Sequence, residues 1–336
     1  MATMKAVQID APGAELVLVN REIPEPGPRE VLIKVEACGV CHGDAIPGQG
    51  TFPGLSYPRV PGHEVVGTIV EYGSQVGGWE PGTRVGVGWS GGHCMTCAAC
   101  IAGDFHRCED ALTTGLSADG GYAEYMVARS SALVSIPSEL SSVDAAPLLC
   151  AGGTTFSALK DSGAKGGDVV AIHGIGGLGH LAIQYANRLG FKTVALSRGH
   201  DKEALALKLG AHVYIDTESV DAAKELKKLG GARVILATAP NAKAIAGLVN
   251  GLGINGQLII VAAPSEPLMV FPGMLFNGDR SIKGWHGRRA GEALDFSVRF
   301  NVMPMIETFP LERAAEAFDK MMTAKVHFRA VLTTGS

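Results

Sequence analysis

Residues 169–179 read VVAIHGIGGLG, an apolar run that leads directly into a glycine-rich turn. Beyond the turn, apolar side chains recur at helical spacing between Leu178 and Leu189, which predicts a helix with one buried face. A strand, a tight glycine turn and an amphipathic helix in this order are typical of a unit that binds a dinucleotide. We therefore expect a Rossmann fold, an α/β architecture with a doubly wound parallel sheet.

The glycines of this turn have distinct predicted roles. Gly174 permits the tight turn, Gly176 lets the backbone approach a pyrophosphate, and Gly179 lets helix and strand pack closely. Gly177 and Leu178 complete the turn, so a phosphate would lie at the helix N-terminus, where free N–H groups favour an anion. The alternative is a glycine-rich loop without function, which the position between strand and helix disfavours.

The end of the second predicted strand bears on the choice of cofactor. An acidic residue about 20 positions after the glycines would accept hydrogen bonds from the ribose hydroxyl of NAD. Ser197 and Arg198 stand there instead, with Lys202 close behind. A hydroxyl and a guanidinium suit a 2′-phosphate, which favours NADP(H) over NAD(H). The alternative is that Arg198 and Lys202 are only solvated charges.

The pattern of the sequence changes near residue 147. Before it, β-branched runs such as 31–35 and 65–70, separated by Gly and Pro, predict an irregular β-rich domain. After it, predicted strands at 169–173, 193–196, 233–236 and 257–261 alternate with helices. We expect residues 147–285 to form the nucleotide-binding domain, and residues 1–146 and 286–336 to form the second domain.

Composition excludes several classes of partner. The chain of 336 residues has 46% hydrophobic and 18% charged side chains, a net charge of −4 and dispersed basic residues. This gives no reason to expect nucleic acid or a membrane as partner, and it points to a small molecule. The N-terminus lacks the pattern of a secretory signal and no apolar run is long enough to span a bilayer, so we expect a cytoplasmic location.

Four of the seven cysteines are clustered, at Cys94, Cys97, Cys100 and Cys108. Four thiolates so close in sequence can close a tetrahedral shell around Zn²⁺ and leave no position for a substrate. In a reducing compartment, clustered thiols are more often metal ligands than disulfides, so we predict a structural zinc site. The rival is an iron–sulfur cluster, whose common spacings this sequence does not match.

Cys41, His63 and Cys150 are scattered, each in a turn marked by glycine or proline. They could supply the two thiolates and one imidazole of a zinc site that keeps one position open. Alone, such a set is weak evidence, because buried cysteine and histidine are common. Their contexts, CGVCHGD at 38–44 and PGHEVVG at 61–67, are more informative.

These segments and the four-cysteine run resemble those of zinc-dependent alcohol dehydrogenases of the medium-chain dehydrogenase/reductase superfamily, above all the microbial and cinnamyl-alcohol-dehydrogenase-like members. The resemblance covers nearly the whole chain. It implies a GroES-like catalytic domain with a structural zinc lobe near residues 90–110, two zinc ions per chain, and a homodimer or homotetramer. It further implies a catalytic zinc held by Cys41, His63 and Cys150, with Glu64 as a transient ligand and Asp44 orienting His63. His42 and Arg329 would face the cofactor phosphates, and Thr154 would lie beside the nicotinamide. The substrate pocket would contain Gly43, Trp89 and Trp285.

Gly43 departs from the family pattern. Family members usually carry Ser or Thr two residues after the zinc cysteine, where the hydroxyl passes the substrate proton toward solvent. Without it, either the proton leaves through water or a cofactor ribose hydroxyl to His42, or simple alcohols turn over poorly. The missing side chain is also expected to widen the pocket for bulky or aromatic substrates. Nearby Cys38 is expected to be a packed apolar residue.

The expected activity is reversible hydride transfer between NADP(H) and an alcohol, aldehyde or ketone. One alternative is a zinc-independent enone or quinone reductase of the same superfamily, which the cysteine and histidine residues disfavour. Another is an NADPH-binding protein without turnover, in which Gly43 would mark lost catalysis. Metal content and a panel of substrates distinguish the three.

Overall fold

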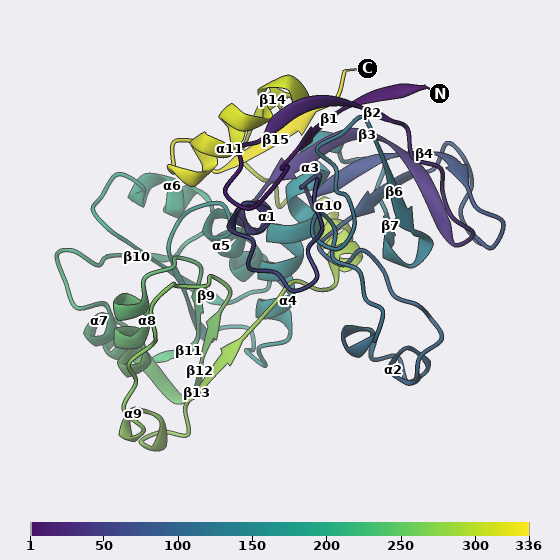
Figure 1. The fold of residues 1–336 in the computed structure, drawn as a ribbon. Helices are drawn as coiled ribbons and strands as arrows, with labels where there is room; N and C mark the ends of the chain where they lie inside the picture. Colours follow the sequence, from purple (N-terminus) through teal and green to yellow (C-terminus); the bar gives the residue numbers. More distant parts are fainter. Residues whose placement is uncertain (1, 336) are drawn as a thin grey trace. The chain divides into compact units, whose positions relative to one another are not determined.

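The computed structural model describes residues 2–335, which divide into two compact units (Figure 1). The first unit runs up to Cys150, includes Ala290–Val298, and resumes at Pro304. The second unit comprises Ala151–Arg289 and Arg299–Met303. The last part of the chain therefore returns to the unit that contains the first part.

The second unit contains a parallel sheet whose strand order is β10-β9-β8-β11-β12-β13 among the described residues. Its strands are β8 (Val169–His173), β9 (Lys192–Ser197), β10 (Val213–Asp216), β11 (Ala232–Ala237), β12 (Leu252–Ile260) and β13 (Ser281–Gly284). The strand order reverses between β8 and β11, and ligands of such sheets bind at the carboxyl ends of the strands beside this reversal. The predicted Rossmann fold is confirmed.

Among the described residues, one helix directly precedes these strands and five connect them. They are α4 (Gly153–Lys160), α5 (Gly179–Arg188), α6 (Glu203–Lys208), α7 (Ala222–Lys228), α8 (Ala242–Leu248) and α9 (Gly273–Phe276). Helix α5 begins at Gly179, the last glycine of the turn, and buries Leu181, Ala182 and Tyr185 completely. The side chains of Asp221 and Asn241 accept backbone N–H groups and cap the first turns of α7 and α8.

The first unit is built on a larger sheet, with strand order β14-β15-β3-β4-β5-β7 and β6 paired to β3 within residues 2–335. These strands are β3 (Glu30–Val40), β4 (Val65–Tyr72), β5 (Arg84–Val87), β6 (Tyr125–Arg129), β7 (Leu133–Ser135), β14 (Ile306–Pro310) and β15 (Arg329–Thr333), and the hairpin β1 (Thr3–Gln8) and β2 (Val17–Glu22) is separate. Its helices are α1 (Ile46–Gln49), α2 (Ala98–Ile101), α3 (Ser142–Pro147), most of α10 (Ala290–Phe300) and α11 (Ala314–Met322). In Figure 1 the yellow strand β15 lies between β14 and β3, and β3 comes from the other end of the sequence.

Two differences from the expected strands have a local cause. Strand β12 begins at Leu252, five residues before the predicted Gln257, because Leu252 already pairs with Ala232 on β11. The sequence also makes residues 268–271 a possible edge strand, but no strand forms there, and β10 and β13 are the edge strands of this sheet among the described residues. Pro267 and Pro272 flank that segment and lack the N–H groups that a strand donates.

Every helix within residues 2–335 is too short or too polar to cross a bilayer.

Candidate metal centres and nucleotide site

Sheet pairing brings the scattered cysteine and histidine residues together in the first unit. Cys41 follows β3, and His63 and Glu64 directly precede β4. The two strands are antiparallel, with Cys38 opposite Val65, so the end of β3 meets the start of β4. Cys150 lies in the turn after α3 that spans Leu148–Gly152.

The four side chains form a compact donor set. The Sγ atoms of Cys41 and Cys150 are 4.0 Å apart, and one ligand atom from each of Cys41, His63, Glu64 and Cys150 lies within 4.8 Å of the others. Nε2 of His63 and Oε2 of Glu64 are buried and have no hydrogen-bond partner within residues 2–335. Buried polar atoms normally have partners, and sulfur, imidazole nitrogen and carboxylate oxygen are zinc ligands. The donor set therefore fits a zinc ion.

Asp44 orients the imidazole of His63. Its Oδ1 lies 2.7 Å from Nδ1 of His63 and 3.2 Å from the amide nitrogen of Gly62. Its Oδ2 accepts the amide N–H of Cys41 at 2.9 Å and the hydroxyl of Tyr122 at 3.1 Å. With Nδ1–H donated to the carboxylate, Nε2 keeps its lone pair for a metal. Sequence reasoning missed Tyr122, because no motif marks its contact with Asp44.

Charge at this site is balanced by Arg329 from β15. Its guanidinium forms a buried ion pair with Glu64, although the family resemblance had placed it at a cofactor phosphate. Burial raises the pKa of the Glu64 carboxyl to about 7, against the opposing effect of Arg329. The hydrogen bond with Cys150, helped by the charges of His63 and Arg329, holds the pKa of Cys41 well below its usual value. A thiolate is the form that binds zinc.

The space beside Gly43 is filled. A Cβ atom on Gly43 would lie 2.7 Å from Cζ3 of Trp89 and 2.9 Å from Cε1 of His63. The rings of Trp89 and His63 meet edge to face, with centroids 4.8 Å apart. The expected widening of the pocket at Gly43 was therefore wrong, because Trp89 occupies the room that the absent side chain leaves. His42 is exposed, and Cys38 is 1% exposed within the core of the sheet.

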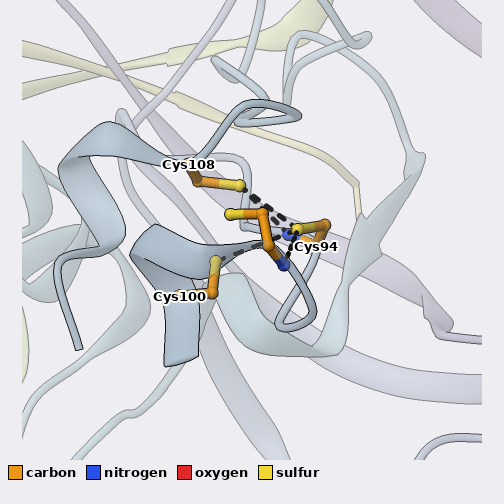
Figure 2. Close-up of side chains that lie close together, drawn as sticks. Cys94, Cys100 and Cys108 are labelled. Atoms are coloured by element: carbon orange, nitrogen blue, oxygen red, sulfur yellow. Dashed lines mark hydrogen bonds between the residues drawn. The ribbon is translucent and has the colours of Figure 1, made fainter. Parts of the chain in front are cut away.

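The clustered cysteines form a second donor set, shown in Figure 2. Sγ of Cys94 lies 3.9 Å from Sγ of Cys100 and 3.6 Å from Sγ of Cys108, while the amide N–H of Cys97 donates to it at 3.3 Å. Hydrogen bonds from Thr96 lower the pKa of Cys94 to about 6. All four thiols are free, so they are available as ligands of a closed tetrahedral site.

In the second unit, the glycine turn has the geometry that its sequence predicts. Gly174 has a φ of +93°, and a Cβ there would lie 2.8 Å from Cβ of Ala239. A Cβ on Gly179 would overlap the carbonyl oxygen of Gly174, whereas a Cβ on Gly176 would meet nothing within 4 Å. Gly174 and Gly179 thus allow close packing, and Gly176 leaves the backbone open to a ligand.

The remaining residues that were expected to contact cofactor or substrate differ in exposure and in hydrogen bonding. Ser197 ends β9, Arg198 is exposed, and Nζ of Lys202 donates to the carbonyl oxygen of Ile175 at 2.8 Å. Lys202 is therefore anchored to the glycine turn. Thr154 is buried on α4, and the buried Trp285 donates its indole N–H to Oγ of Ser157 at 3.0 Å.

Comparisons with known proteins agree with this chemistry. The family model described as "Alcohol dehydrogenase GroES-like domain" matches residues 27–138, and that described as "Zinc-binding dehydrogenase" matches 177–299. The alcohol dehydrogenase notN of Aspergillus sp. (strain MF297-2) is 44% identical over 324 residues, which are 96% of this chain and 95% of the relative.

Two solved structures have the same fold over the whole length. A cinnamyl alcohol dehydrogenase of Sorghum bicolor has a TM-score of 0.87 and 29% identity, covering 99% of this chain and 98% of the other. A zinc-binding dehydrogenase of Sinorhizobium meliloti 1021 bound to NADP has a TM-score of 0.88 and 27% identity, covering 99% and 100%. The chain belongs to the zinc-type alcohol dehydrogenases of the medium-chain dehydrogenase/reductase superfamily, with a GroES-like domain and a Rossmann fold.

Proposed function

We propose that this alcohol dehydrogenase transfers hydride reversibly between NADP(H) and an alcohol, aldehyde or ketone at a zinc ion held by Cys41, His63 and Cys150. The observation that carries the proposal is the convergent donor set, in which buried Nε2 of His63 has no partner among the described residues. The same chain contains a glycine turn with an open backbone at Gly176.

Each residue around the donor set has a part in this proposal. When bound, zinc polarises a carbonyl oxygen or lowers the pKa of an alcohol. Asp44 fixes the imidazole of His63, Glu64 is a reserve carboxylate ligand, and Trp89 forms a wall beside His63. The exposed His42 exchanges the substrate proton with solvent, because position 43 has no hydroxyl.

A second zinc ion in the lobe of Cys94, Cys97, Cys100 and Cys108 is part of the proposal. Its four thiol ligands leave no open position, so its role is structural. Metal analysis should find two zinc ions per chain, as the two donor sets predict. A zinc-independent enone reductase would bind at most the structural ion.

The preference for NADP(H) rests on Ser197 and Arg198. The strand β9 ends without a carboxylate that could accept the ribose hydroxyls of NAD, and Arg198 is exposed with its charge unpaired within residues 2–335. The Sinorhizobium relative bound to NADP supports the choice. Kinetics with NADPH and NADH in parallel test it, and a higher kcat/KM with NADH would overturn it.

The decisive experiment compares two cysteine variants on protein of measured zinc content. Cys41→Ala should abolish turnover of a panel of alcohols and aldehydes while nucleotide binding persists, because Cys41 is placed in the catalytic donor set. Cys38→Ala is the matched control, since Cys38 is buried three residues away and outside that set. Turnover by the Cys41→Ala variant would refute the mechanism, and an inactive wild type would favour a non-catalytic NADPH-binding protein.

We also propose a homodimer formed through the second unit. Ile254, Met269, Phe271 and Phe276 are each at least 75% exposed, and they lie in segments next to the edge strand β13. Leu268 and Val270 point into the core, so Met269 and Phe271 project the opposite way. Exposed apolar side chains of this size mark an interface.

Light scattering should give a dimer, and Phe271→Glu with Phe276→Glu should give a monomer. A tetramer that falls to dimers in the double variant would still support this surface, whereas an assembly that the double variant leaves unchanged would contradict it.

We further propose a cytoplasmic location, because clustered cysteines with the spacing of metal ligands are typical of a reducing compartment.

A further inference from the structure

A cavity of about 880 Å³ lies in the second unit at the carboxyl ends of β8 and β9. Its walls include His173, the residue before the glycine turn, and Arg198, the residue after β9. The segment 217–221 before α7 also lines it, and helices α7 and α8 contribute Lys224 and Lys227 on the first and Lys243 on the second. We call it the α7–α8 cavity.

His173 indicates that a ligand completes this cavity. The residue is 8% exposed, and its Nδ1 is buried without a hydrogen-bond partner among residues 2–335. An unpartnered polar atom costs about 1–3 kcal/mol, so such atoms are rare unless something outside the chain satisfies them. A ligand with a polar group would supply the partner.

The basic residues of the cavity differ in whether another group of the chain binds their charge. Nζ of Lys227 donates to the carbonyl oxygen of Leu252 at 2.7 Å, and Nζ of Lys224 is 3.7 Å from Oδ2 of Asp221. Arg198 and Lys243 have no hydrogen bond or ion pair to any described residue, yet both line the cavity. Two cations from different elements are therefore free to bind an anion.

The acidic residues of the cavity do not cancel these charges. Asp221 accepts the amide N–H groups of Ala223 and Lys224 and is engaged as the cap of α7. Glu218 is the acidic side chain that remains free in the described part of the cavity. Within residues 2–335, the lining has four basic side chains and two carboxylates, a formal charge of +2, which favours an anion such as a phosphate monoester.

Lys202 had been the expected second cation for such a phosphate. One N–H of its ammonium donates to the carbonyl oxygen of Ile175, which holds Lys202 at the glycine turn, and Lys202 is not among the residues that line the cavity. We propose that Lys243 is a specificity-determining residue which, with Arg198, binds the 2′-phosphate of NADP(H) in the α7–α8 cavity. The proposal rests on the proposed function, because it requires NADP(H) as cofactor. Arg198 presents a planar fork to two phosphate oxygens, and the Lys243 ammonium acts as a point charge on the third.

The test uses the full-length, zinc-loaded enzyme and four probes: NADPH, NADH, 2′,5′-ADP and 5′-AMP. Within each pair, the members differ by the 2′-phosphate alone. Lys243→Gln should weaken NADPH and 2′,5′-ADP about tenfold and leave NADH and 5′-AMP within about twofold, as expected for loss of one charged hydrogen bond. Lys224→Gln is the matched control, because Lys224 lines the same cavity but is paired with Asp221.

Two further variants separate the possible failures. Arg198→Gln should also weaken NADPH selectively, and Glu218→Gln should leave NADPH binding intact or strengthen it by removing a negative charge. If the wild type binds NADH more tightly than NADPH, both the cofactor preference and the role of Lys243 are refuted. If Arg198→Gln loses the preference and Lys243→Gln keeps it, the role of Lys243 alone is refuted. An equal loss for all four probes in Lys243→Gln also refutes it.

Discussion

At the scale of single residues, Tyr122 stands out because its role depends on one hydroxyl. The ring is completely buried in the core of the first unit, and the hydroxyl donates to Oδ2 of Asp44 at 3.1 Å. Asp44 in turn holds Nδ1 of His63 at 2.7 Å. Tyr122 is thus a positioning residue, which acts on His63 through Asp44.

Tyr122→Phe should therefore weaken zinc binding without unfolding the protein. The phenyl ring fills the same volume, but Asp44 loses one of its four hydrogen bonds. Loss of such an outer contact lowers metal affinity by about 10-fold or more. Competition with a chromogenic chelator measures the affinity, and Tyr125→Phe on β6 is the control. Equal zinc affinity in Tyr122→Phe and wild type would rule out the positioning role.

Gly43 gives a second prediction, which concerns packing. Gly43→Ser restores a hydroxyl but places Cβ 2.7 Å from Cζ3 of Trp89. Overpacking of this kind costs about 1–3 kcal/mol, so we expect lower kcat/KM and lower stability in the single variant. Gly43→Ser combined with Trp89→Leu should recover part of both, because the clash is gone. Higher activity in Gly43→Ser alone would show that the hydroxyl outweighs the packing.

At the scale of elements, the ion pair between Glu64 and Arg329 joins the start of β4 to β15. Both side chains are at most 5% exposed. Removing one partner of a buried pair leaves an uncompensated charge. The pair therefore couples the two segments more strongly than an exposed pair would.

Arg329→Met should destabilise the zinc-loaded protein by about 3 kcal/mol, and the added change Glu64→Gln should return part of that loss. Urea midpoints of the first transition measure the difference. The control is Arg313→Met, whose partner Glu316 is 43% exposed; we expect a change below about 0.5 kcal/mol there. Similar losses of stability in Arg329→Met and Arg313→Met would mean that burial does not strengthen the ion pair between Glu64 and Arg329.

Helices, strands and turns whose sequence pattern lies within one continuous segment could be predicted from the sequence. The run of apolar residues, glycines and helical spacing at 169–189 lies in one segment, and it gave β8, the turn and α5 correctly. The contact between Glu64 and Arg329 spans 265 positions and depends on the order of strands in a sheet. Such an order, and the filling of the space at Gly43 by Trp89, follow only from the folded chain.

At the scale of the whole molecule, the cysteines report on metal content. Six of the seven cysteines belong to the two donor sets, and Cys38 is buried in the core. A coloured thiol reagent should react slowly with the zinc-loaded protein, because bound thiolates are protected. After chelation six thiols should react, and the seventh should require denaturant. Fast reaction of all seven before chelation would contradict two occupied cysteine sites.

The return of β15 to a place between β14 and β3 implies an order of events during synthesis. The four cysteines from Cys94 to Cys108 leave the ribosome together, so their lobe can capture an ion while most of the chain is still unmade. Arg329 is synthesised 265 residues after Glu64. The ion pair between them can form only after β15 has paired with β3. The donor set that contains Glu64 is therefore completed after the four-cysteine set, and a stalled nascent chain would hold the four-cysteine lobe without the buried ion pair at the other set.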